Sequence, residues 1–435
     1  MKKIKILIYL KLFIISFLLT SCEDRSNLSA PIVENGSANF TTFVTIGNSL
    51  TAGYQSGTLF ESAQKYSYGA LIAKQVGTTY EIPYISDPGT GNRMEVKSVD
   101  LNKGTAEIVY NTASGSPLNS NYPKAYNNLG IPGATLYDII NATSSSNCYA
   151  AIYGGSPNPM FDLILRGKGS QFSQAKSLKP TFVILWIGNN DILGYATSGG
   201  TVPYTPVANF QFLYSQLVDS IASLNAQVVV LNIPDVLSIP FFTTVPPVVQ
   251  NPADGSLINL YGIVGGTTKQ LKLGKDFLTL TSKSEIAAGK GLSPSNPLPD
   301  KYVLDSAEVA TAKNIIAQYN STIATLASAK GFTLVDINSV LNNIATSTNG
   351  VLFNGVRFST KYLTGNLFSL DGVHPTSQGQ AIIANEIIKA INSKYNANIP
   401  LINVATIPGS IILQKYNSNN NIIPIFNNDK FNILF

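Results

Sequence analysis

Four short apolar runs are spread along the chain, at residues 41–47, 181–187, 227–233 and 332–337. All four are rich in β-branched and aromatic residues, and they are apolar at nearly every position instead of every second one. Such runs are typical of parallel strands that are covered on both faces of a sheet. A sheet of this kind needs helices between its strands. The sequence therefore predicts an α/β domain with right-handed crossovers.

Amphipathic helices are indicated before the third and fourth runs and again near the end of the chain. Their apolar residues recur every three or four positions, which is the spacing of one helix face. The last helix begins at Ser377-x-x-Gln380, which predicts a capping box in its first turn. The apolar positions are Phe210, Leu213, Leu217, Ile221 and Leu224 in the first helix, Ile316, Tyr319, Ile323 and Leu326 in the second, and Ile383, Ile387 and Ile391 in the third.

Two long stretches do not fit this alternation, near residues 80–125 and 238–303. The first is expected to contain a small hairpin around residues 99–110. The second is rich in proline and partly apolar, and Phe241 and Phe242 are expected to be exposed on a loop. Long stretches without regular structure are rare in compact domains and are commonly functional loops or lids. Each stretch is a candidate for one wall of a substrate groove.

The first 21 residues are expected to be a removable secretion signal. Lys2 and Lys3 open a short basic region, and the apolar run that follows at 12–20 is too short to span a bilayer. The run ends in Leu-Thr-Ser-Cys, which resembles the lipobox of bacterial lipoproteins, in which Cys22 carries the lipid anchor. An ordinary secretory signal that happens to contain a cysteine is the alternative. Residues 22–40 are polar and are expected to form a flexible tether.

Cleavage before Cys22 would leave 414 residues that are attached to a membrane through this cysteine. The signal contains four lysines and no acidic residue, so its removal lowers the formal net charge from +5 to +1. No cluster of basic residues then remains, which argues against nucleic acid as a partner. Glu23 follows the cysteine in place of the Asp that resembles an inner-membrane retention signal, which favours the outer membrane of the bacterial cell envelope. Glu23-Asp24 resembles the acidic start of some surface-exported lipoproteins, and the periplasmic and surface faces both stay open.

The chain contains one histidine, His374, and two cysteines. With Cys22 acylated, Cys148 is the only thiol left, so an intramolecular disulfide is impossible. The usual His/Cys metal sites are also excluded, although an all-oxygen cation site is not, and no cofactor is expected. An imidazole is the side chain whose unperturbed pKa suits general-base chemistry near neutral pH. His374 is therefore the candidate base.

Candidate site residues follow two of the predicted strands. Ser49 comes directly after the run at 41–47, and Asn190 comes just after the run at 181–187. The carboxyl ends of parallel strands face the ligand crevice, so both side chains are expected on one rim of the sheet. Gly133 lies in a third loop, where the absence of a side chain would let a backbone N–H group approach an oxyanion.

Four sequence blocks resemble the motifs of the SGNH, or GDSL-like, lipase and esterase family and occur in the family's order. The resemblance implies a three-layer α/β/α sandwich with a parallel five-stranded, flavodoxin-like sheet. This domain would comprise residues 41–395, with the two long stretches as insertions. Residues 396–435 would be a C-terminal tail, which either packs as an extra strand or trails loosely. The blocks are GNSLTAG at 47–53, NLGIPGAT at 128–135, WIGNND at 186–191 and DGVHP at 371–375.

The same resemblance implies the chemistry of a serine ester hydrolase. By this match Ser49 would be the nucleophile, His374 the general base and Asp371 the acid that orients the imidazole. The backbone N–H groups of Ser49 and Gly133, with the side-chain amide of Asn190, would form the oxyanion hole.

Each residue also has a structural interpretation when it is taken alone. Ser49 and Asp191 are suitable helix N-caps, and Gly133 is a suitable turn glycine. The family's usual aspartate before the nucleophile is Asn48 here, which puts the hydrogen bonding of that loop in question more than the chemistry. The joint occurrence of the blocks in one order is what favours catalysis.

The favoured reaction is hydrolysis of carboxyl esters, of lipids or of simple acyl groups, through an acyl-enzyme. Phe241 and Phe242, expected to be exposed, would favour an acyl chain. Two alternatives stay open, namely removal of O-acetyl groups from a carbohydrate and a surface binding lipoprotein without catalytic activity. The expected partners are a small-molecule or glycan ester and, through Cys22, a membrane.

Overall fold

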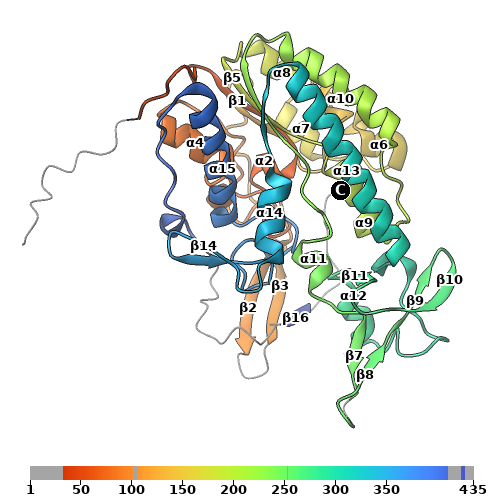
Figure 1. Ribbon diagram of the computed structural model, residues 1–435. Coiled ribbons are helices and arrows are strands. Elements are labelled where there is room, and N and C mark those ends of the chain that lie inside the picture. Colours follow the sequence, from red (N-terminus) through yellow and green to blue (C-terminus); the bar gives the residue numbers. More distant parts are fainter. Residues whose placement is uncertain (1–32, 101–104, 252, 410–422, 427–435) are drawn as a thin grey trace, which may run out of the picture. The chain divides into compact units, whose positions relative to one another are not determined.

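A five-stranded parallel sheet lies at the centre of the compact unit Asn35–Phe435 (Figure 1). The computed structural model describes residues 33–100, 105–251, 253–409 and 423–426. The strand order is β13-β6-β5-β1-β4, and all neighbouring strands are parallel. The predicted parallel α/β sheet is therefore confirmed. Its strands are β1 (Phe43–Gly47), β4 (Asn128–Gly130), β5 (Phe182–Trp186), β6 (Gln227–Leu231) and β13 (Thr333–Val335).

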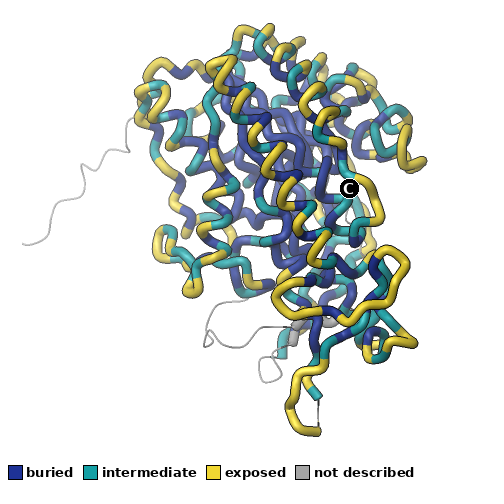
Figure 2. The backbone as a smooth tube through the Cα atoms, turned by 45° about the vertical axis from the view of Figure 1, so that its right-hand side comes forward, coloured by how far each residue is buried: buried dark blue, intermediate teal, exposed yellow. Residues whose placement is uncertain are grey.

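The central strands are buried on both faces, which explains the continuous apolar runs in the sequence. In β5, Val183 and Leu185 belong to one hydrophobic cluster, whereas Phe182, Ile184 and Trp186 belong to a second one on the opposite face. Figure 2 shows this buried backbone in dark blue, behind helices that carry many exposed positions. A strand covered in this way has no polar face and hence no alternating pattern.

Helices cover the two faces of the sheet, which gives the three-layer sandwich that the family resemblance implied. One set contributes to the first hydrophobic cluster and the other to the second. In Figure 1, α4 and α15 lie on the opposite side of the sheet from α10 and α13. The first set is α7 (Met160–Leu165), α8 (Gln171–Ser177), α9 (Asn190–Thr197), α10 (Val207–Ala222) and α13 (Ser306–Ala329), and the second is α4 (Tyr68–Val76), α14 (Ile337–Thr346) and α15 (Ser377–Tyr395).

Outside the stretch at 238–303, six short helical turns of the described residues lie in the connections between the strands and the longer helices. Four of them precede the helices of the two layers or lie between them, and two are 3₁₀ turns. They are α2 (Ser49–Ala52), α3 (Glu61–Gln64), α5 (Asp138–Asn141), α6 (Tyr149–Gly154), η2 (Ser145–Asn147) and η4 (Val404–Thr406).

Strand β4 was not expected from the sequence. It has three residues, of which only Leu129 is apolar, so no run marks it. Its place is set by pairing with β1, in which Thr45 lies opposite Asn128 and Gly47 opposite Gly130. A strand this short is specified by tertiary packing more than by its own residues.

The capping box predicted at the start of α15 is wrong. The N-cap residue is Thr376, whose Oγ1 accepts a hydrogen bond from the N–H of Gly379 at 3.0 Å. Gln380 is buried and faces the interior instead. Its amide nitrogen donates to the carbonyl oxygen of Leu50 at 2.9 Å, and its Oε1 accepts from the N–H of Tyr68 at 3.0 Å. The glutamine thus joins α15 to α2 and α4.

The stretch at 80–125 contains the predicted hairpin, formed by β2 (Arg93–Asp100) and β3 (Thr105–Asn111). Strand β16 (Ile423–Phe426) pairs with β3 in parallel, so part of the C-terminal tail packs as an extra strand. Residues 410–422 and 427–435 of the tail lie outside the described residues.

The stretch at 238–303 is built from short hairpins and turns. The prediction that Phe241 and Phe242 are exposed is wrong, because they are 2% and 1% exposed. They lie in a single helical turn that starts at Pro240, and this turn directs both rings into the hydrophobic core. The elements are α11 (Pro240–Thr243), β7 (Val248–Gln250), β8 (Leu257–Asn259), β9 (Tyr261–Val264), β10 (Thr267–Gln270), β11 (Phe277–Leu278), α12 (Ser282–Ala287), η3 (Asp300–Tyr302) and β12 (Val303–Leu304).

The residues just before β1 pack on the domain. Ala38 and Phe40 are buried, and the ring of Phe40 stacks on Phe182 at a centroid distance of 4.5 Å. Residues 38 and 40 of the stretch expected to be a tether therefore pack on the domain, and residues 22–32 of that stretch lie outside the described part of the chain. None of the described helices is long and apolar enough to cross a membrane.

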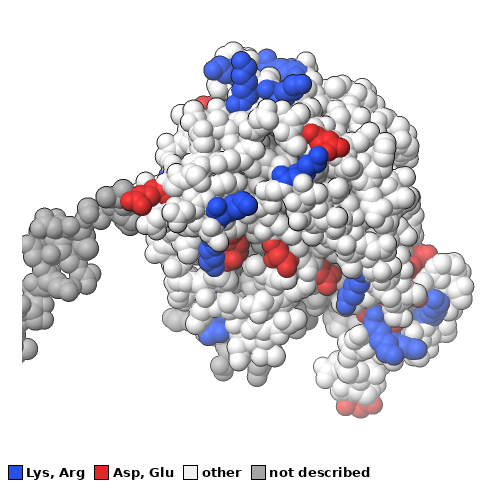
Figure 3. Space-filling view, turned by 45° about the horizontal axis from the view of Figure 1, so that its top comes forward, with Lys and Arg blue, Asp and Glu red and all other residues white. Residues whose placement is uncertain are grey.

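Charged side chains are sparse on the face shown in Figure 3. This matches the 12% content of Asp, Glu, Lys and Arg in the sequence. Apart from a group of Lys and Arg at the top of the view, the two signs are scattered. Most of this face therefore offers no continuous field of one sign that would steer a charged partner.

A buried carboxyl group fixes the loop that follows β4. Asp138 accepts hydrogen bonds from the N–H and Oγ1 of Thr135, at 2.8 and 2.9 Å, and from the N–H of Tyr149 at 2.6 Å. Burial raises the pKa of Asp138 to about 6. The carboxyl group thus joins the loop to α6.

A second buried carboxyl group, Asp191, joins the same loop to α9. It accepts hydrogen bonds from the N–H of Leu136 at 2.9 Å and from Thr205 Oγ1 at 2.8 Å. The interpretation of Asp191 as a helix N-cap is wrong, because Asn189 is the N-cap residue of α9. Burial raises the pKa of Asp191 to about 7, and the nearby charge of Asp138 also raises it.

We expect the raised pKa of Asp191 to cost stability at neutral pH. An aspartate in an unfolded chain has a pKa of about 3.9, so the folded protein binds a proton more strongly. The contribution of Asp191 to the free energy of unfolding therefore falls as the pH rises from about 4 to about 7. Asp191→Asn removes this loss. The free energy of unfolding of Asp191→Asn minus that of wild type should therefore increase by roughly 2 to 3 kcal/mol as the pH rises from 5 to 8. Urea denaturation at each pH provides the measurement.

The control for this experiment is Asp254→Asn, in the exposed turn between β7 and β8. Hydrogen bonds from Ser256 hold the pKa of Asp254 below its usual range. The stability of Asp254→Asn relative to wild type should therefore not increase as the pH rises from 5 to 8. A difference between Asp191→Asn and wild type that stays constant from pH 5 to pH 8 would contradict the expectation.

Candidate active site

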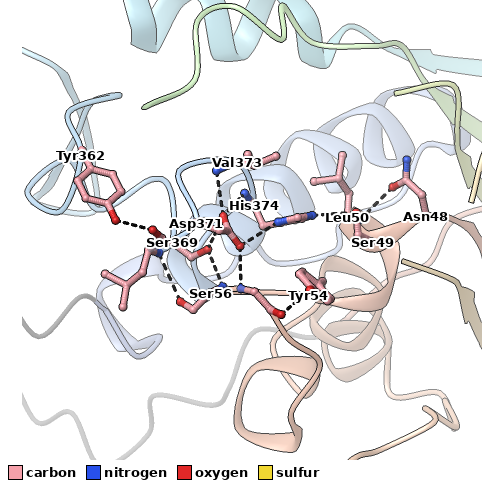
Figure 4. A network of polar contacts seen from close by, with 12 residues as sticks. Asn48, Ser49, Leu50, Tyr54, Ser56, Tyr362, Ser369, Asp371, Val373 and His374 are labelled. Carbon is pink, nitrogen blue, oxygen red and sulfur yellow. Dashed lines mark hydrogen bonds and ion pairs between the residues drawn. The ribbon is translucent and has the colours of Figure 1, made fainter. Parts of the chain in front are cut away.

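Three side chains from distant parts of the chain form one line of hydrogen bonds (Figure 4). Ser49 Oγ lies 2.9 Å from His374 Nε2, and His374 Nδ1 lies 3.0 Å from Asp371 Oδ2. All three residues are buried. Ser49 is the first residue of α2 and is separated from β1 by Asn48 alone, whereas Asp371 and His374 lie in the loop before α15. The structure thus brings together the residues that were predicted as nucleophile, orienting acid and base.

The Asp371 carboxylate accepts five hydrogen bonds. Its Oδ1 accepts from the N–H groups of Val373 and His374, both at 2.9 Å, and from Ser369 Oγ at 3.1 Å. Its Oδ2 accepts from the N–H of Gly57 at 3.1 Å as well as from the imidazole. Burial by itself raises the pKa of Asp371, but the charge and hydrogen bonds of His374 outweigh burial and hold the pKa below its usual range. An ionised carboxylate only accepts, so Nδ1 carries the proton and Nε2 accepts from the serine hydroxyl.

A neighbouring loop that the sequence alone did not point to supports the carboxylate. The N–H of Ser56 donates to Ser369 Oγ at 2.9 Å, and Ser56 Oγ accepts from the N–H of Leu370 at 3.3 Å. The hydroxyl of Tyr54 donates to the carbonyl oxygen of Gly57, and its ring lies 4.7 Å from the imidazole, centroid to centroid. Tyr54, Ser56 and Gly57 directly follow the GNSLTAG block. This position is the only feature of the sequence that could have indicated their role at the site.

The loop that carries His374 is held on another side by the stretch at 238–303. The N–H of Phe241 donates to the carbonyl oxygen of Gly372 at 3.0 Å. Gly372 has a φ of +72°, and a Cβ atom there would lie 3.0 Å from the Phe241 nitrogen and 3.2 Å from Leu280 Cδ2. Both the backbone conformation and the space favour glycine at this position. The insertion therefore fixes the histidine loop through a backbone contact.

Asn48, the departure from the family's pattern, is hydrogen-bonded through both its side-chain oxygen and its side-chain nitrogen. Its Oδ1 accepts from the N–H of Leu50 at 3.1 Å, which caps α2. Its Nδ2 donates to Asn189 Oδ1 at 3.2 Å. An aspartate in this orientation would place a carboxylate oxygen against the oxygen of Asn189. The two asparagines thus form a matched pair, and the loop keeps its hydrogen bonds.

Gly133 lies at the same edge of the sheet as Ser49. Strand β4 ends opposite Gly47 of β1, and Ile131 continues this contact by donating its N–H to the Gly47 carbonyl oxygen at 3.1 Å. Gly133 follows with a φ of +80°. Its N–H group and the N–H group of Ser49 have no hydrogen-bond partner among the residues that the structure describes.

The side-chain amide of Asn190 lines the same pocket as Ser49 and His374. Its Nδ2 donates to the carbonyl oxygen of Ala134 at 2.8 Å. An amide nitrogen carries two hydrogens, so one N–H remains for another acceptor. The structure therefore offers two backbone donors and one amide donor at this rim, from the residues that were predicted.

The pocket beside Ser49 is mostly apolar, with an empty volume of about 500 Å³ that includes open solvent. Such a lining suits an uncharged, apolar group better than a charged one. Its polar residues are Asn48, Ser49, Asn189, Asn190 and His374, and its apolar residues are Leu50, Trp186, Leu193, Pro234, Val236, Ile239, Leu341, Phe368, Val373 and Pro375.

Within the described part of the chain, no group of three or more His, Cys, Asp or Glu side chains is placed to hold a metal ion. Cys148 is buried, and its Sγ lies 3.2 Å from the carbonyl oxygen of Ser145. Cys22, the predicted lipid anchor, lies outside the described residues.

The solved structures that match this chain include several hydrolases. An α/β hydrolase from the metagenome of Lake Arreo, LAE5, has a TM-score of 0.36 at 13% identity, over 82% of this chain and 96% of its own. The acetylxylan esterase Axe2 of Geobacillus stearothermophilus has a TM-score of 0.36 at 13% identity, over 83% and 98%. A lipase/acylhydrolase of Enterococcus faecalis has a TM-score of 0.34 at 12% identity, over 83% and 98%. Such values are too low to transfer a substrate or a residue role.

Comparison with protein families gives a specific result. No curated protein sequence matches the chain. Residues 43–387 match the family GDSL-like Lipase/Acylhydrolase, a range that runs from β1 into α15 and contains all four sequence blocks. Because this match covers most of the chain, the protein belongs to the GDSL-like lipase/acylhydrolase family and is a hydrolase of ester bonds.

Proposed function

We propose that Ser49 attacks the ester carbonyl, that His374 is its general base and that Asp371 orients the imidazole. The observation that carries the proposal is the continuous line of hydrogen bonds, 2.9 Å from Ser49 Oγ to His374 Nε2 and 3.0 Å from His374 Nδ1 to Asp371 Oδ2. A nucleophile, a base within proton-transfer reach and a third group that orients the base are the parts that acyl transfer needs.

The reaction would proceed through an acyl-enzyme. As Ser49 Oγ attacks, its proton passes to His374 Nε2, and the negative charge of Asp371 stabilises the imidazolium. The imidazolium then protonates the leaving alcohol oxygen as the ester C–O bond breaks. A water molecule then attacks the acyl carbon as the same Nε2 takes its proton. The acyl bond to Ser49 Oγ breaks as the imidazolium returns this proton to Oγ, which releases the carboxylic acid. The ionised state of Asp371, which its lowered pKa supports, is required in both halves.

The oxyanion of each tetrahedral intermediate would be bound by three donors. These are the backbone N–H groups of Ser49 and Gly133 and the second N–H of the Asn190 amide. The two backbone groups have no other partner among the described residues, and the amide is already held by Ala134. Donors that are fixed before the reaction stabilise developing charge without reorganisation.

Variants of the three residues test these roles. Ser49→Ala and His374→Ala should each reduce kcat with p-nitrophenyl acetate to a small residual value, because each removes a reacting group. Asp371→Asn should lower kcat on the order of 10⁴-fold, because an amide favours the wrong imidazole tautomer. Steady-state kinetics on purified variants, with circular dichroism to verify folding, provide the measurement. Wild-type turnover in a folded Ser49→Ala variant would refute the assignment.

We propose a carboxyl ester with an apolar acyl group as the substrate. Phe241 and Phe242 give no support, since both are buried. The support comes from the apolar lining of the pocket beside Ser49, which includes Val236, Ile239 and Leu341. Such a pocket gains binding energy for each methylene group that it removes from water.

An O-acetylated carbohydrate is the second candidate, and one feature favours it. A polar hollow lies on the other side of the segment that lines the acyl pocket, because Asp235 faces the hollow whereas Pro234 and Val236 face the pocket. Asparagine side chains and hydroxyl groups exchange hydrogen bonds in both directions. The residues of the hollow are Asp235, Lys313, Ile316, Ala317, Asn320, Asn338 and Asn342.

Substrate panels separate the two candidates. With p-nitrophenyl esters, we expect kcat/KM to rise up to about fourfold per added CH₂ until the pocket is full. Val236→Phe should lower the rates for longer chains more than the rate for acetate, because it narrows the pocket. Asn342→Ala, the matched variant in the polar hollow, should leave these rates unchanged. Release of acetate from acetylated xylan, combined with no activity beyond acetate, would contradict the lipid ester.

We also propose that residues 1–21 are a signal peptide and that Cys22 anchors the protein to the outer membrane, with residues 41–395 as the hydrolase domain. The support is the Leu-Thr-Ser-Cys sequence at the end of the apolar run. An anchored hydrolase would meet esters at or near a membrane surface.

Lipid labelling tests the anchor. In cells that express the full chain, alkyne-palmitate should label the wild type and Cys148→Ser, whose thiol is buried. Cys22→Ser should carry no label and leave the membrane fraction, because the acylated sulfur is lost. Wild-type protein without label, recovered in the soluble fraction, would contradict the proposal.

A further inference from the structure

We infer that Asp191 is a positioning residue for the oxyanion hole, because its carboxyl group and the neighbouring amide of Asn190 together hold the loop that carries Gly133. The inference rests on the proposed function of the same site. It adds a residue that contacts neither the nucleophile nor the base.

Two consecutive residues of α9 bind alternate residues of the loop. Asn190 Nδ2 donates to the carbonyl oxygen of Ala134 at 2.8 Å, and Asp191 Oδ2 accepts from the N–H of Leu136 at 2.9 Å. Gly133 directly precedes Ala134 in the chain. A shift of this loop would therefore move the N–H of Gly133 and turn the amide of Asn190 at the same time. Two of the three proposed donors depend on one contact region.

The carboxyl group of Asp191 is itself fixed from the opposite side. It is 3% exposed, and its Oδ1 accepts from Thr205 Oγ1 at 2.8 Å. The N–H of Thr205 donates to the main-chain carbonyl oxygen of Asp191 at 2.9 Å, and the hydroxyl of Tyr319 donates to the carbonyl oxygen of Thr205. Tyr319 belongs to the long helix α13. The loop is thus connected through Asp191 to a rigid element of the helix layer.

A buried carboxyl group lowers the stability of the folded protein when it is ionised, so stability alone does not explain its use to hold a loop. Burial raises the pKa of Asp191, which shows that its ionised form is disfavoured there. Residues that cost stability and are nevertheless well bonded are typical of sites where geometry serves function. This supports a role for Asp191 in catalysis through the loop.

Removal of the acceptor should affect kcat more than KM. Oxyanion donors act in the transition state, so their misplacement slows the chemical step and leaves binding of the ester largely unchanged. Asp191→Ala should lower kcat for p-nitrophenyl acetate roughly tenfold to hundredfold, with KM within about threefold. Asp191→Asn keeps an oxygen that can accept from Leu136, so it should restore kcat to within about threefold.

A double-mutant cycle distinguishes positioning from general destabilisation. Asn190→Ala alone should lower kcat roughly 10² to 10³-fold. In the double variant Asp191→Ala/Asn190→Ala, the loss should be clearly smaller than the product of the single losses, because the amide that Asp191 helps to position is absent. Ile221→Ala, a variant of a buried residue in α10 that does not line the pocket, should lower the melting temperature but not kcat. If Asp191→Ala does not fold, Thr205→Val removes the second bond to the carboxyl group and serves in its place.

The outcomes separate this inference from the proposed function. A reduced kcat with an unchanged KM in Asp191→Ala and recovery of kcat in Asp191→Asn both support it. A loss of kcat in the double variant that is smaller than the product of the single losses also supports it. Unchanged kcat in a folded Asp191→Ala or Thr205→Val variant, or losses that multiply in the double variant, would overturn it while Ser49 remained essential. Full activity of Ser49→Ala would instead overturn the proposed function itself.

Discussion

The hydrogen bond between Ser49 Oγ and His374 Nε2 joins two residues that are 325 positions apart, and the fold around it serves to keep that bond. One end depends on β1, which places Ser49 at the carboxyl edge of the sheet. The other end depends on a loop that is held by Asp371, by the stretch at 53–57 and by α11. Because each of these supports comes from a different part of the chain, the site forms only when the whole domain is folded.

The site and the loop beside it place carboxyl groups in the interior of the domain, where burial disfavours their charged form. Asp371 is buried but accepts five hydrogen bonds, so its charge is compensated locally. Asp138 and Asp191 are less well compensated, and burial raises the pKa of both. The three carboxyl groups thus differ in how well their charge is stabilised. Asp371 is stabilised as an ion beside the imidazole, whereas Asp138 and Asp191 hold a loop at a cost in stability. Functional sites commonly show this trade.

Much of the sheet could be predicted because strands buried on both faces have continuous apolar runs, and the helices because their faces are amphipathic. The site residues were selected because four blocks matched a family pattern, and the structure brings them to one rim. What the sequence did not reveal depends on tertiary contacts. The three residues of β4 carry no pattern, Gln380 turns inward because Tyr68 and Leu50 offer partners, and Phe241 is buried because Pro240 starts a helical turn. Likewise, nothing local marks Asp191 as a partner of Leu136.

The central claim is that the buried imidazole makes one serine nucleophilic. Labelling with a fluorophosphonate, followed by mass spectrometry of the peptides, tests it most directly, since the reagent reacts with activated serines without regard to the natural ester. The account predicts a single adduct on Ser49 that is lost on heating the protein and in His374→Ala. Absence of an adduct on the folded protein, or an adduct on a different serine, would contradict it and leave a binding protein with the fold of a hydrolase.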